Sequence, residues 1–434
     1  MNVNEVARRA RLAALKVAVV SSVTKNRAIL EIAEQIQRQK SQVKEVNDDD
    51  VRHASEANLS EPLTKRLILD DSKIADLTKG LKLLAELEDP VGKTLDSLEM
   101  DRGLELYKVT SPIGVIGAIF ESRPDALVQI ASLCLKSGNS VILKGGVEAR
   151  RSNQFLTELI RNAIGQSSEI PEDSVQLLDT REDVAQLLRL DDYVDLLVPR
   201  GSSSLVKYVK ENTKIPVLGH AEGICHEYID VDADLAMAVE ICFDAKVQYP
   251  AVCNAVNTLL VHEDIAEAFL PKMARRFQEA TVELRGDERT KKILPDAKQA
   301  SEKDWSTEYL DLILNIKIVD SLKQAIDHIN RFSTHHTDGI ITQNEKNARE
   351  FLREVDSSVV IHNASTRFSD GYRFGFGAEV GISTEKTHAR GPVGLEGLVT
   401  YKYIISATGQ VVSSYVGENA KAFTYRKLGK NWNR

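Results

Sequence analysis

Cysteine is scarce in this chain of 434 residues, which contains only Cys134, Cys225, Cys242 and Cys253. No two of them form a CxxC pair, so neither zinc binding nor thioredoxin-like redox chemistry is predicted, and we expect no metal site. Cysteines this few and this widely spaced favour a reducing compartment over a disulfide framework. We therefore expect a cytoplasmic protein.

An excess of basic residues and a long apolar run are also lacking. Lys and Arg number 56 against 64 Asp and Glu, so we expect no nucleic-acid partner. No apolar run reaches the length that spans a bilayer, so no membrane association is expected. The N-terminal stretch ARRARLAALKVAVVSSV resembles a signal sequence in outline, but Lys16 interrupts it and its apolar residues follow a helical period. An amphipathic first helix is the better interpretation.

Linkers rich in proline or serine, internal repeats and low-complexity tracts are lacking as well. Residues 3–90 have the apolar spacing of helices. From about residue 104, short apolar runs such as 257–262 alternate with helix-patterned segments, which predicts an α/β fold with βαβ units and a mostly parallel sheet. A chain of this length predicts two or three domains, and we expect them to pack closely around a cleft.

Cys253 is the first candidate for chemistry, because it stands at the mouth of a predicted strand beside Asn254. A thiolate there would attack an activated acyl carbon to form a thioester, with backbone N–H groups holding the oxyanion. Asn254 would add a donor or shape the turn. The alternative is a small buried hydrophobe, the commoner role of free cysteine. No spacing identifies a histidine partner among His220, His226 and His262.

Two further segments have the pattern of phosphate or cofactor sites, each with an ordinary alternative. Lys144 ends a predicted parallel strand, and ligands bind at that end of open α/β sheets. The position of Lys144 is equally consistent with an ordinary lysine that faces solvent. Gly201 and Ser202 open a helix whose N–H groups would attract phosphate, or they simply cap that helix.

The C-terminal third contains a glycine-rich stretch, 374–397, which predicts an ordered, ligand-facing loop. Arg367 precedes it and offers a guanidinium that would grip a carboxylate or phosphate. The segment from residue 396 is rich in β-branched and aromatic residues, with no helix after it. This pattern predicts an exposed edge strand, and we expect a second copy of the chain to cover it in a homo-oligomer.

Together these segments resemble the γ-glutamyl phosphate reductase family, a branch of the aldehyde dehydrogenase superfamily. The resemblance runs from about residue 4 to about 425 and is carried by SPIGVIGAIFESRPDALVQIASLCLKSGNSVILKGG, LGHAEGICHEYID, YPAVCNAVNTLLVH and EVGISTEKTHARGPVGLEGLVTYKYII. It implies an aldehyde-dehydrogenase-like fold of three parts. These are a Rossmann-like NADP(H)-binding domain over 1–103 and 117–240, an α/β catalytic domain over 241–395, and a small β oligomerisation arm over 104–116 and 396–425.

The resemblance also implies an activity: NADPH-dependent reduction of L-glutamyl 5-phosphate to L-glutamate 5-semialdehyde and phosphate through a cysteine thioester. This is the second step of proline biosynthesis from glutamate, and a glutamate 5-kinase is a candidate partner. By position, the family implies Cys253 and Asn254 as catalytic residues. The implied cofactor contacts are Lys144 with the adenosine ribose, Gly201 and Ser202 with the pyrophosphate, and Glu308 with the nicotinamide ribose. Arg367 and Ser383, in the loop 381–392, are the candidates for substrate binding.

The sequence departs from the aldehyde-oxidising members of the superfamily at several points. Glu121, Ser122 and Arg123 stand where those enzymes often carry an asparagine that donates to the oxyanion, and no glutamate matches their hydrolytic base. Val147 replaces a glutamate that reads NAD, which is compatible with NADPH. Two alternatives stay open: a phosphate-independent, NAD(P)-dependent aldehyde dehydrogenase that acts on a small semialdehyde, and a non-catalytic binding subunit.

Overall fold

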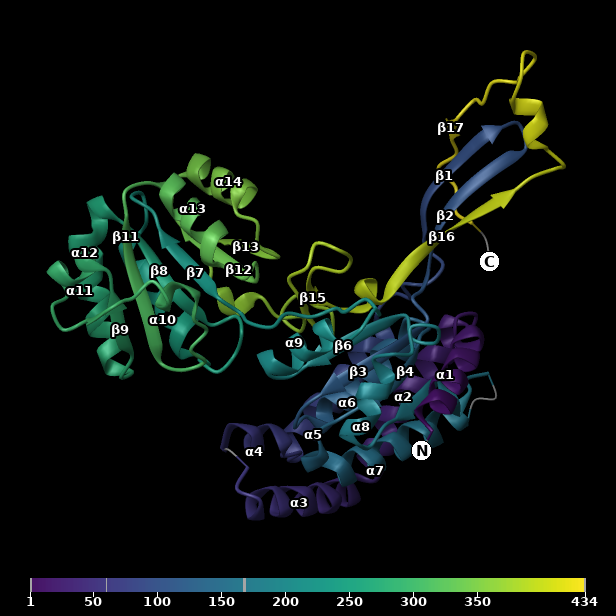
Figure 1. Ribbon diagram of the computed structural model, residues 1–434, viewed down its shortest axis with the longest axis horizontal. Helices are drawn as coiled ribbons and strands as arrows, with labels where there is room; N and C mark the ends of the chain where they lie inside the picture. The colour runs from purple at the N-terminus through teal and green to yellow at the C-terminus, as the bar shows by residue number, and fades with distance from the viewer. Residues whose placement is uncertain (1, 60, 167–168, 433–434) are drawn as a thin grey trace. The chain divides into compact units, whose positions relative to one another are not determined.

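The computed structural model describes residues 2–59, 61–166 and 169–432, and most of its helices and strands are labelled in Figure 1. The chain divides into two compact units. The first comprises residues 1–218, 376–381 and 393–434, and the second comprises 219–375 and 382–392. In the described parts of the chain, no helix is both long and apolar enough to cross a membrane.

The first unit contains a four-stranded parallel sheet in the order β5-β4-β3-β6. Its strands are β3 (Val115–Phe120), β4 (Ser140–Lys144), β5 (Val175–Leu177) and β6 (Leu196–Arg200). β3 and β4 are buried along their whole length. Strands covered on both faces are expected to read as continuous apolar runs, and that explains why these segments are recognisable in the sequence.

Nine α-helices of the first unit lie among the described residues: α1 (Val3–Val17), α2 (Ser22–Arg38), α3 (Lys40–Glu56), α4 (Glu61–Leu67), α5 (Asp71–Glu86), α6 (Pro124–Lys136), α7 (Arg150–Gly165), α8 (Arg181–Leu187) and α9 (Ser203–Glu211). The N-terminal segment is the expected amphipathic helix. Val3, Val6 and Ala10 of α1 pack into one buried cluster with Ile119 and Ile142 of the sheet. The apolar period that argued against a signal sequence therefore serves core packing.

A second sheet of the first unit is antiparallel, in the order β16-β2-β1-β17. Its strands are β1 (Thr94–Asp101), β2 (Leu104–Pro112), β16 (Val399–Ser406) and β17 (Arg426–Lys427). The two ranges expected for a β arm, 104–116 and 396–425, thus pair with each other through β2 and β16. The sequence pattern missed β1, which folds back on β2 through Gly103 at a φ of 75° that glycine adopts without strain.

The second unit is built on a seven-stranded sheet in the order β10-β9-β11-β8-β7-β12-β13, and every pairing in it is parallel. Its strands are β7 (Cys225–Ile229), β8 (Val256–His262), β9 (Glu283–Gly286), β10 (Lys298–Gln299), β11 (Ile313–Val319), β12 (Thr337–Ile341) and β13 (Val359–His362). Its helices are α10 (Leu235–Val247), α11 (Glu263–Glu279), α12 (Glu288–Ile293), α13 (Leu322–Phe332) and α14 (Glu345–Glu354).

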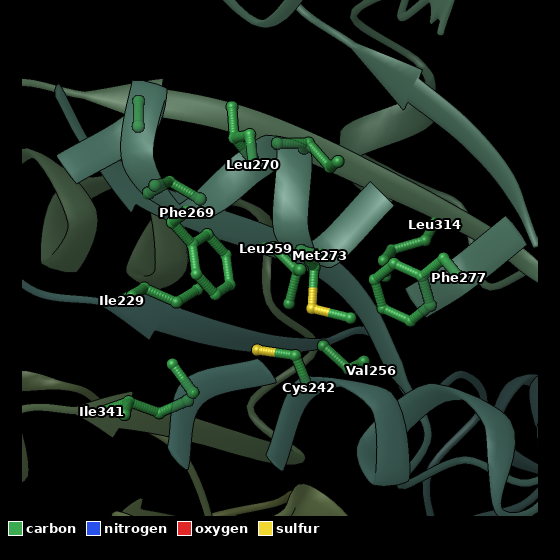
Figure 2. Close-up of a cluster of buried hydrophobic side chains, with 14 of the residues drawn as sticks. Ile229, Cys242, Val256, Leu259, Phe269, Leu270, Met273, Phe277, Leu314 and Ile341 are labelled. Carbon is green, nitrogen blue, oxygen red and sulfur yellow. The ribbon is translucent and has the colours of Figure 1, made fainter. Parts of the chain in front are cut away.

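Successive side chains of each strand point to opposite faces of the sheet. Both faces carry apolar residues here, and helices cover both of them. Figure 2 shows one face, where Cys242 of α10 and Met273 of α11 meet Ile229, Leu259 and Ile341 of the central strands. On the other face, neighbouring residues of the same strands pack against α13 and α14. Both faces are therefore core, as expected for a parallel sheet.

The division between the two units differs from the expected boundary at residues 240 and 241, which falls inside α10. The structure divides the chain at residues 218 and 219 instead. The physical reason is strand pairing: β7 is hydrogen-bonded to β8 on one side and to β12 on the other. The chain crosses between the units again within β14 (Gly381–Ser383) and β15 (Gly391–Val393), which pair as a two-stranded ribbon.

A buried histidine makes the second unit sensitive to acid. His328 of α13 packs its ring against His226, Trp305 and Phe332, and its Nε2 has no hydrogen-bond partner among the described residues. Burial, followed by the proximity of His226, lowers the pKa of His328 from 6.5 to about 2. Below about pH 6.5 the unfolded chain therefore binds one proton more than the folded chain. The free energy of unfolding consequently falls as the pH is lowered.

We predict that wild-type protein loses about 2 kcal/mol of stability between pH 7 and pH 5 through His328, and that His328→Phe removes this loss because phenylalanine fits the ring cluster without titrating. Urea unfolding followed by circular dichroism at both pH values measures the difference. Trp305→Phe is the control, since it disturbs the same cluster but keeps the imidazole and so the pH dependence. Equal losses in wild type and His328→Phe would contradict the prediction.

Candidate functional site

Three segments of the second unit meet where the central strands begin. Gly223 precedes β7, Cys253 precedes β8, and His336 precedes β12. Because β8, β7 and β12 are parallel neighbours, their starting points lie along one edge of the sheet. The candidate site is therefore at the amino edge of this sheet. In most open α/β sheets, ligands bind at the carboxyl edge instead.

Cys253 occupies the turn between α10 and β8, and of the chain's four cysteines it alone is not buried. Burial raises the pKa of the other three thiols, Cys134, Cys225 and Cys242, which keeps them protonated and unreactive. Cys242 fits the alternative of a packing residue, since it belongs to the core in Figure 2. Cys253 has the accessibility that a nucleophile needs.

The backbone of Gly223 lies directly against the Cys253 turn. A Cβ at position 223 would lie 2.6 Å from the Cβ of Cys253 and would overlap its carbonyl group. The same carbonyl oxygen accepts a hydrogen bond from Sγ of Cys225 at 3.2 Å, and Asn257 donates its side-chain amide to the carbonyl of Gly223 at 2.9 Å. These contacts hold the thiol-bearing turn against β7, and they require glycine at 223.

Asn254 and Arg367 hold the same turn from the other side. The amide nitrogen of Asn254 donates to the carbonyl of Ser369 at 2.8 Å, and its oxygen accepts from Arg367. Arg367 also donates through Nε to Gln248 at 2.9 Å. Both residues are buried, and these contacts of the Asn254 side chain are those expected if it shapes the turn, one of the two roles that the sequence left open.

Arg367 also brings charge to the site. Burial, followed by repulsion from Arg373, lowers its pKa, and attraction to Asp370 and Cys253 opposes that shift. An arginine stays charged under all ordinary conditions, so the guanidinium is a fixed positive charge beside the Cys253 turn. This charge favours an anionic sulfur or an anionic substrate group nearby.

Two histidines that sequence reasoning did not select stand next to Cys253. A ring nitrogen of His220, a ring nitrogen of His336 and Sγ of Cys253 all lie within 4.8 Å of one another. The two imidazole rings meet edge to face, with their centroids 4.8 Å apart. The sequence offers His220 as one of three candidate partners without a reason to prefer it, and it does not single out His336. No signal in the sequence could have found this pairing, because it arises from the strand order.

Glu308 lies at the same edge of the sheet. Burial raises its pKa, while the N–H of Gly223 and the proximity of His220 act in the opposite direction. Ser383 is in β14, next to Ile382, whose carbonyl oxygen is 2.9 Å from Nδ1 of His220. Ser383 is buried, and its hydroxyl has no hydrogen-bond partner among the described residues. Glu308, Ser383 and Arg367 thus gather around the segments that hold Cys253.

The remaining predicted residues lie in the first unit. Lys144 ends β4, where its buried Nζ donates to the carbonyl of Gly145 at 2.6 Å, and burial lowers its pKa. Beside it, a small hollow is lined by Gly145, Gly146 and residues from α7 and the end of β5. Asn153 lines this hollow, and its buried Oδ1 lacks a partner among the described residues. A polar group from a ligand would satisfy that oxygen.

Gly201 and Ser202 stand at the start of α9, as expected, and an anionic group already faces them. The carboxylate of Glu121 accepts the backbone N–H of Ser202 at 2.7 Å and its hydroxyl at 3.4 Å. A Cβ at position 201 would overlap this carboxylate. The turn therefore binds an anion in the manner expected of a phosphate-binding helix start, with Glu121 in that position.

Comparisons with known proteins agree with this geometry. A family model described as "Aldehyde dehydrogenase family" matches residues 1–304. The γ-glutamyl phosphate reductase of Pelotomaculum thermopropionicum is 54% identical over 432 residues, covering 100% of this chain and 99% of the relative. The crystal structure of γ-glutamyl phosphate reductase from Thermotoga maritima has a TM-score of 0.92 and 43% identity, covering 95% of this chain and 100% of that one.

A more distant solved structure is glyceraldehyde-3-phosphate dehydrogenase from Methanocaldococcus jannaschii, complexed with NADP. It has a TM-score of 0.68 at 17% identity and covers 94% of each chain. At that identity the likeness concerns the fold alone. The expected aldehyde-dehydrogenase-like α/β fold is thereby confirmed.

Gly223→Ala should displace the Cys253 turn, because the added methyl group overlaps backbone atoms that cannot rotate away. We expect a stability loss of about 1–3 kcal/mol, the usual cost of overpacking, together with a changed rate of Cys253 alkylation. Urea unfolding and mass spectrometry of iodoacetamide-treated protein measure the two effects.

Gly80→Ala is the matched control, since it adds the same methyl group within α5, where the nearest atom outside the helix backbone lies at 3.7 Å. This variant should be neutral or slightly stabilising. If Gly223→Ala behaved like Gly80→Ala, the contact between Gly223 and Cys253 would not constrain the turn.

Proposed function

The chain belongs to the aldehyde dehydrogenase family and, within it, to the γ-glutamyl phosphate reductases, and on this basis we propose how it acts. The protein is an oxidoreductase of proline biosynthesis. We propose that it reduces L-glutamyl 5-phosphate to L-glutamate 5-semialdehyde with NADPH. The observation that carries the proposal is the accessible thiol of Cys253, held in a fixed turn beside two imidazoles and a guanidinium.

The first chemical step belongs to Cys253. Its thiolate attacks the acyl carbon of the substrate, the C–S bond forms, and the bond from that carbon to the phosphate oxygen breaks. Phosphate leaves with the bonding electron pair, and a thioester remains on Cys253. An acyl phosphate is already activated, so the enzyme needs no group that forces phosphate to leave. The backbone N–H groups of the turn support the oxyanion that forms during attack.

The imidazoles supply the proton acceptor for the thiol. Either His220 or His336 lies close enough to receive the proton when small movements of the turn bring a ring nitrogen to Sγ. The fixed charge of Arg367 favours the thiolate that results. When NADPH is bound, it supplies the hydride that reduces the thioester. Cys253 then leaves as thiolate when the hemithioacetal collapses to the aldehyde.

For the glutamyl part of the substrate we propose Arg367 and Ser383 as the binding residues. Arg367 contributes positive charge near Cys253, and the hydroxyl of Ser383 has its hydrogen-bonding capacity unused within the described residues. Glu308 is proposed to hold the nicotinamide ribose, because it stands at the same sheet edge as Cys253 and carries a carboxylate suited to a sugar hydroxyl.

Members of the aldehyde dehydrogenase family use NAD(P), and the first unit has features that fit such a cofactor. We propose that Lys144 and Asn153 contact the adenosine ribose and that Gly201 and Ser202 bind the pyrophosphate, displacing Glu121. The unpartnered Oδ1 of Asn153 supports the ribose site, and the anion at the start of α9 supports the pyrophosphate site.

The arrangement of Glu148 supports the proposed use of NADPH. Its carboxylate accepts the backbone N–H of Ser122 at 2.8 Å and the Ser122 hydroxyl at 2.5 Å. It is therefore committed to Ser122 instead of serving as the ribose-binding acid that would repel a 2′-phosphate. Arg150 lines the hollow beside Lys144 and adds positive charge, although Asp179 lies 3.8 Å from it.

We propose that the enzyme is cytoplasmic and that it receives its substrate from a partner enzyme. Four free cysteines suit a cytoplasmic enzyme. The acyl phosphate substrate cyclises readily, so we propose a glutamate 5-kinase as the partner that delivers it directly.

The reverse reaction tests the proposed function. We expect NADP⁺ reduction by L-glutamate 5-semialdehyde to require phosphate, because phosphate must cleave the thioester in that direction. The same assay with NAD⁺ should be slower. Cys253→Ala should lose turnover while binding NADPH within a few-fold of wild type. Turnover without phosphate would instead indicate an aldehyde dehydrogenase that uses water, and normal activity of Cys253→Ala would exclude the assigned nucleophile.

We further propose that β16 mediates assembly into a homo-oligomer. It is an edge strand, and Tyr401, Tyr403 and Ile405 on one of its faces are about half exposed or more, at 48%, 60% and 60%. Unpaired edges with exposed apolar side chains favour association with another chain. A second copy is the simplest partner.

Replacing both Tyr403 and Ile405 by lysine should dissociate the oligomer, because charge on an edge strand opposes pairing. Sedimentation at several protein concentrations measures the change. Thr400→Lys, which places one charge on the opposite face of β16, should have a smaller effect. A double variant that sediments like wild type would exclude this face as the interface.

A further inference from the structure

We propose that Cys253, His220 and His336 form a binding site for a soft divalent cation such as Zn²⁺, and that its occupancy inhibits the enzyme reversibly. The three residues provide one sulfur and two imidazole nitrogens, within 4.8 Å of one another. This donor set is the one that zinc prefers, with three protein ligands and a fourth position open to water.

The separations require only a small adjustment. In a tetrahedral site with the usual Zn–S and Zn–N distances, ligand atoms lie about 3.5 Å apart. The three atoms must therefore approach by about 1 Å, which rotation of the partly exposed Cys253 side chain and tilting of the His220 ring can supply. His336 is fully buried and fixed, so it would define the position of the cation.

The hydrogen-bond partners of the two imidazoles are compatible with the tautomers that metal binding needs. Nδ1 of His220 lies 2.9 Å from the carbonyl oxygen of Ile382, so Nδ1 must carry the proton and Nε2 the lone pair. Carbonyl or carboxylate partners of this kind orient most metal-binding histidines. Nδ1 of His336 lies 2.9 Å from Oγ1 of Thr337, a hydroxyl that can accept the Nδ1 proton and is thus compatible with the same tautomer.

His336 provides a second, independent indication of a ligand. Its Nε2 is buried and finds no hydrogen-bond partner within the described residues. A buried nitrogen left unsatisfied costs free energy, which a bound cation would recover. Proton acceptance from Cys253 alone would not require two imidazoles.

The surrounding charges indicate a weak, exchangeable site rather than a structural one. Arg367 places positive charge near Cys253 and opposes a cation, whereas the carboxylate of Glu308 interacts with His220 and favours it. The open side of Cys253 allows exchange with solvent. A bound cation coordinates the lone pair of the Cys253 sulfur, so the C–S bond to the substrate cannot form until the cation leaves.

This inhibition rests on the proposed role of Cys253, but binding of the cation does not, so the two can be tested separately. Co²⁺ is the probe, added to full-length protein freed of metal by a chelator. We expect one Co²⁺ per chain, with the absorption bands of tetrahedral cobalt and a sulfur-to-cobalt charge-transfer band. Zn²⁺ should displace it, and the chelator should restore activity to Zn²⁺-treated enzyme.

Variants assign the ligands. Cys253→Ser should lose the charge-transfer band, and His336→Gln should weaken Co²⁺ binding about tenfold to a hundredfold. Thr337→Val should weaken it by a smaller factor, because it removes only the partner of Nδ1. His335→Gln is the control, since its ring contacts the carbonyl of Asp356 and lies outside the cluster. Circular dichroism verifies that each variant is folded.

Persistence of the sulfur-to-cobalt band in Cys253→Ser, or equal weakening by His336→Gln and His335→Gln, would overturn the proposal. So would the absence of any such band in wild type. An enzyme that binds Co²⁺ as expected but fails the phosphate-dependence assay would refute the proposed function and leave the metal site standing.

Discussion

The parallel pairing of β7 with β8 and β12 is the constraint on which the candidate site depends. It brings the starts of three strands to one edge of the sheet, and so places Gly223, Cys253 and His336 together. The absence of a side chain at Gly223 then lets the thiol-bearing turn approach β7 closely. Without that strand order, these residues would be separate loops with no shared chemistry.

The sheet beneath this site contains polar groups that a purely apolar core would omit. Asp338 accepts hydrogen bonds from His226, Ser333 and Ser357 in the interior. Burial lowers the pKa of the Lys246 ammonium to about 8, and its Nζ donates to the carbonyl of Val256 at the start of β8. Such groups cost stability unless they are paired, and their bonds to strand ends fix the backbone that carries Cys253.

Structural features that depend on adjacent residues could be predicted from the sequence, whereas features that depend on long-range strand pairing could not. The strand expected at 257–262 is β8, and the helix start expected at Gly201 and Ser202 is that of α9, because buried strands and helix starts depend on adjacent residues. β1 was missed, since its sequence TLDSLEMD is acidic and takes its strand conformation from pairing with β2. His336 was missed because sheet order, which no local pattern encodes, brings it to Cys253.

The arrangement around Cys253 links its two proposed properties. A nucleophilic thiol needs a nearby base with a directed lone pair, an open approach and little competition from hydrogen bonds. A soft cation needs the same sulfur, the same lone pairs and the same access. Because an acyl phosphate requires no activated water, the imidazoles can serve the thiol alone. A site arranged to free a thiolate is therefore also suited to the proposed zinc ligation, and the positive charge of Arg367 works against the cation while still favouring the anionic sulfur.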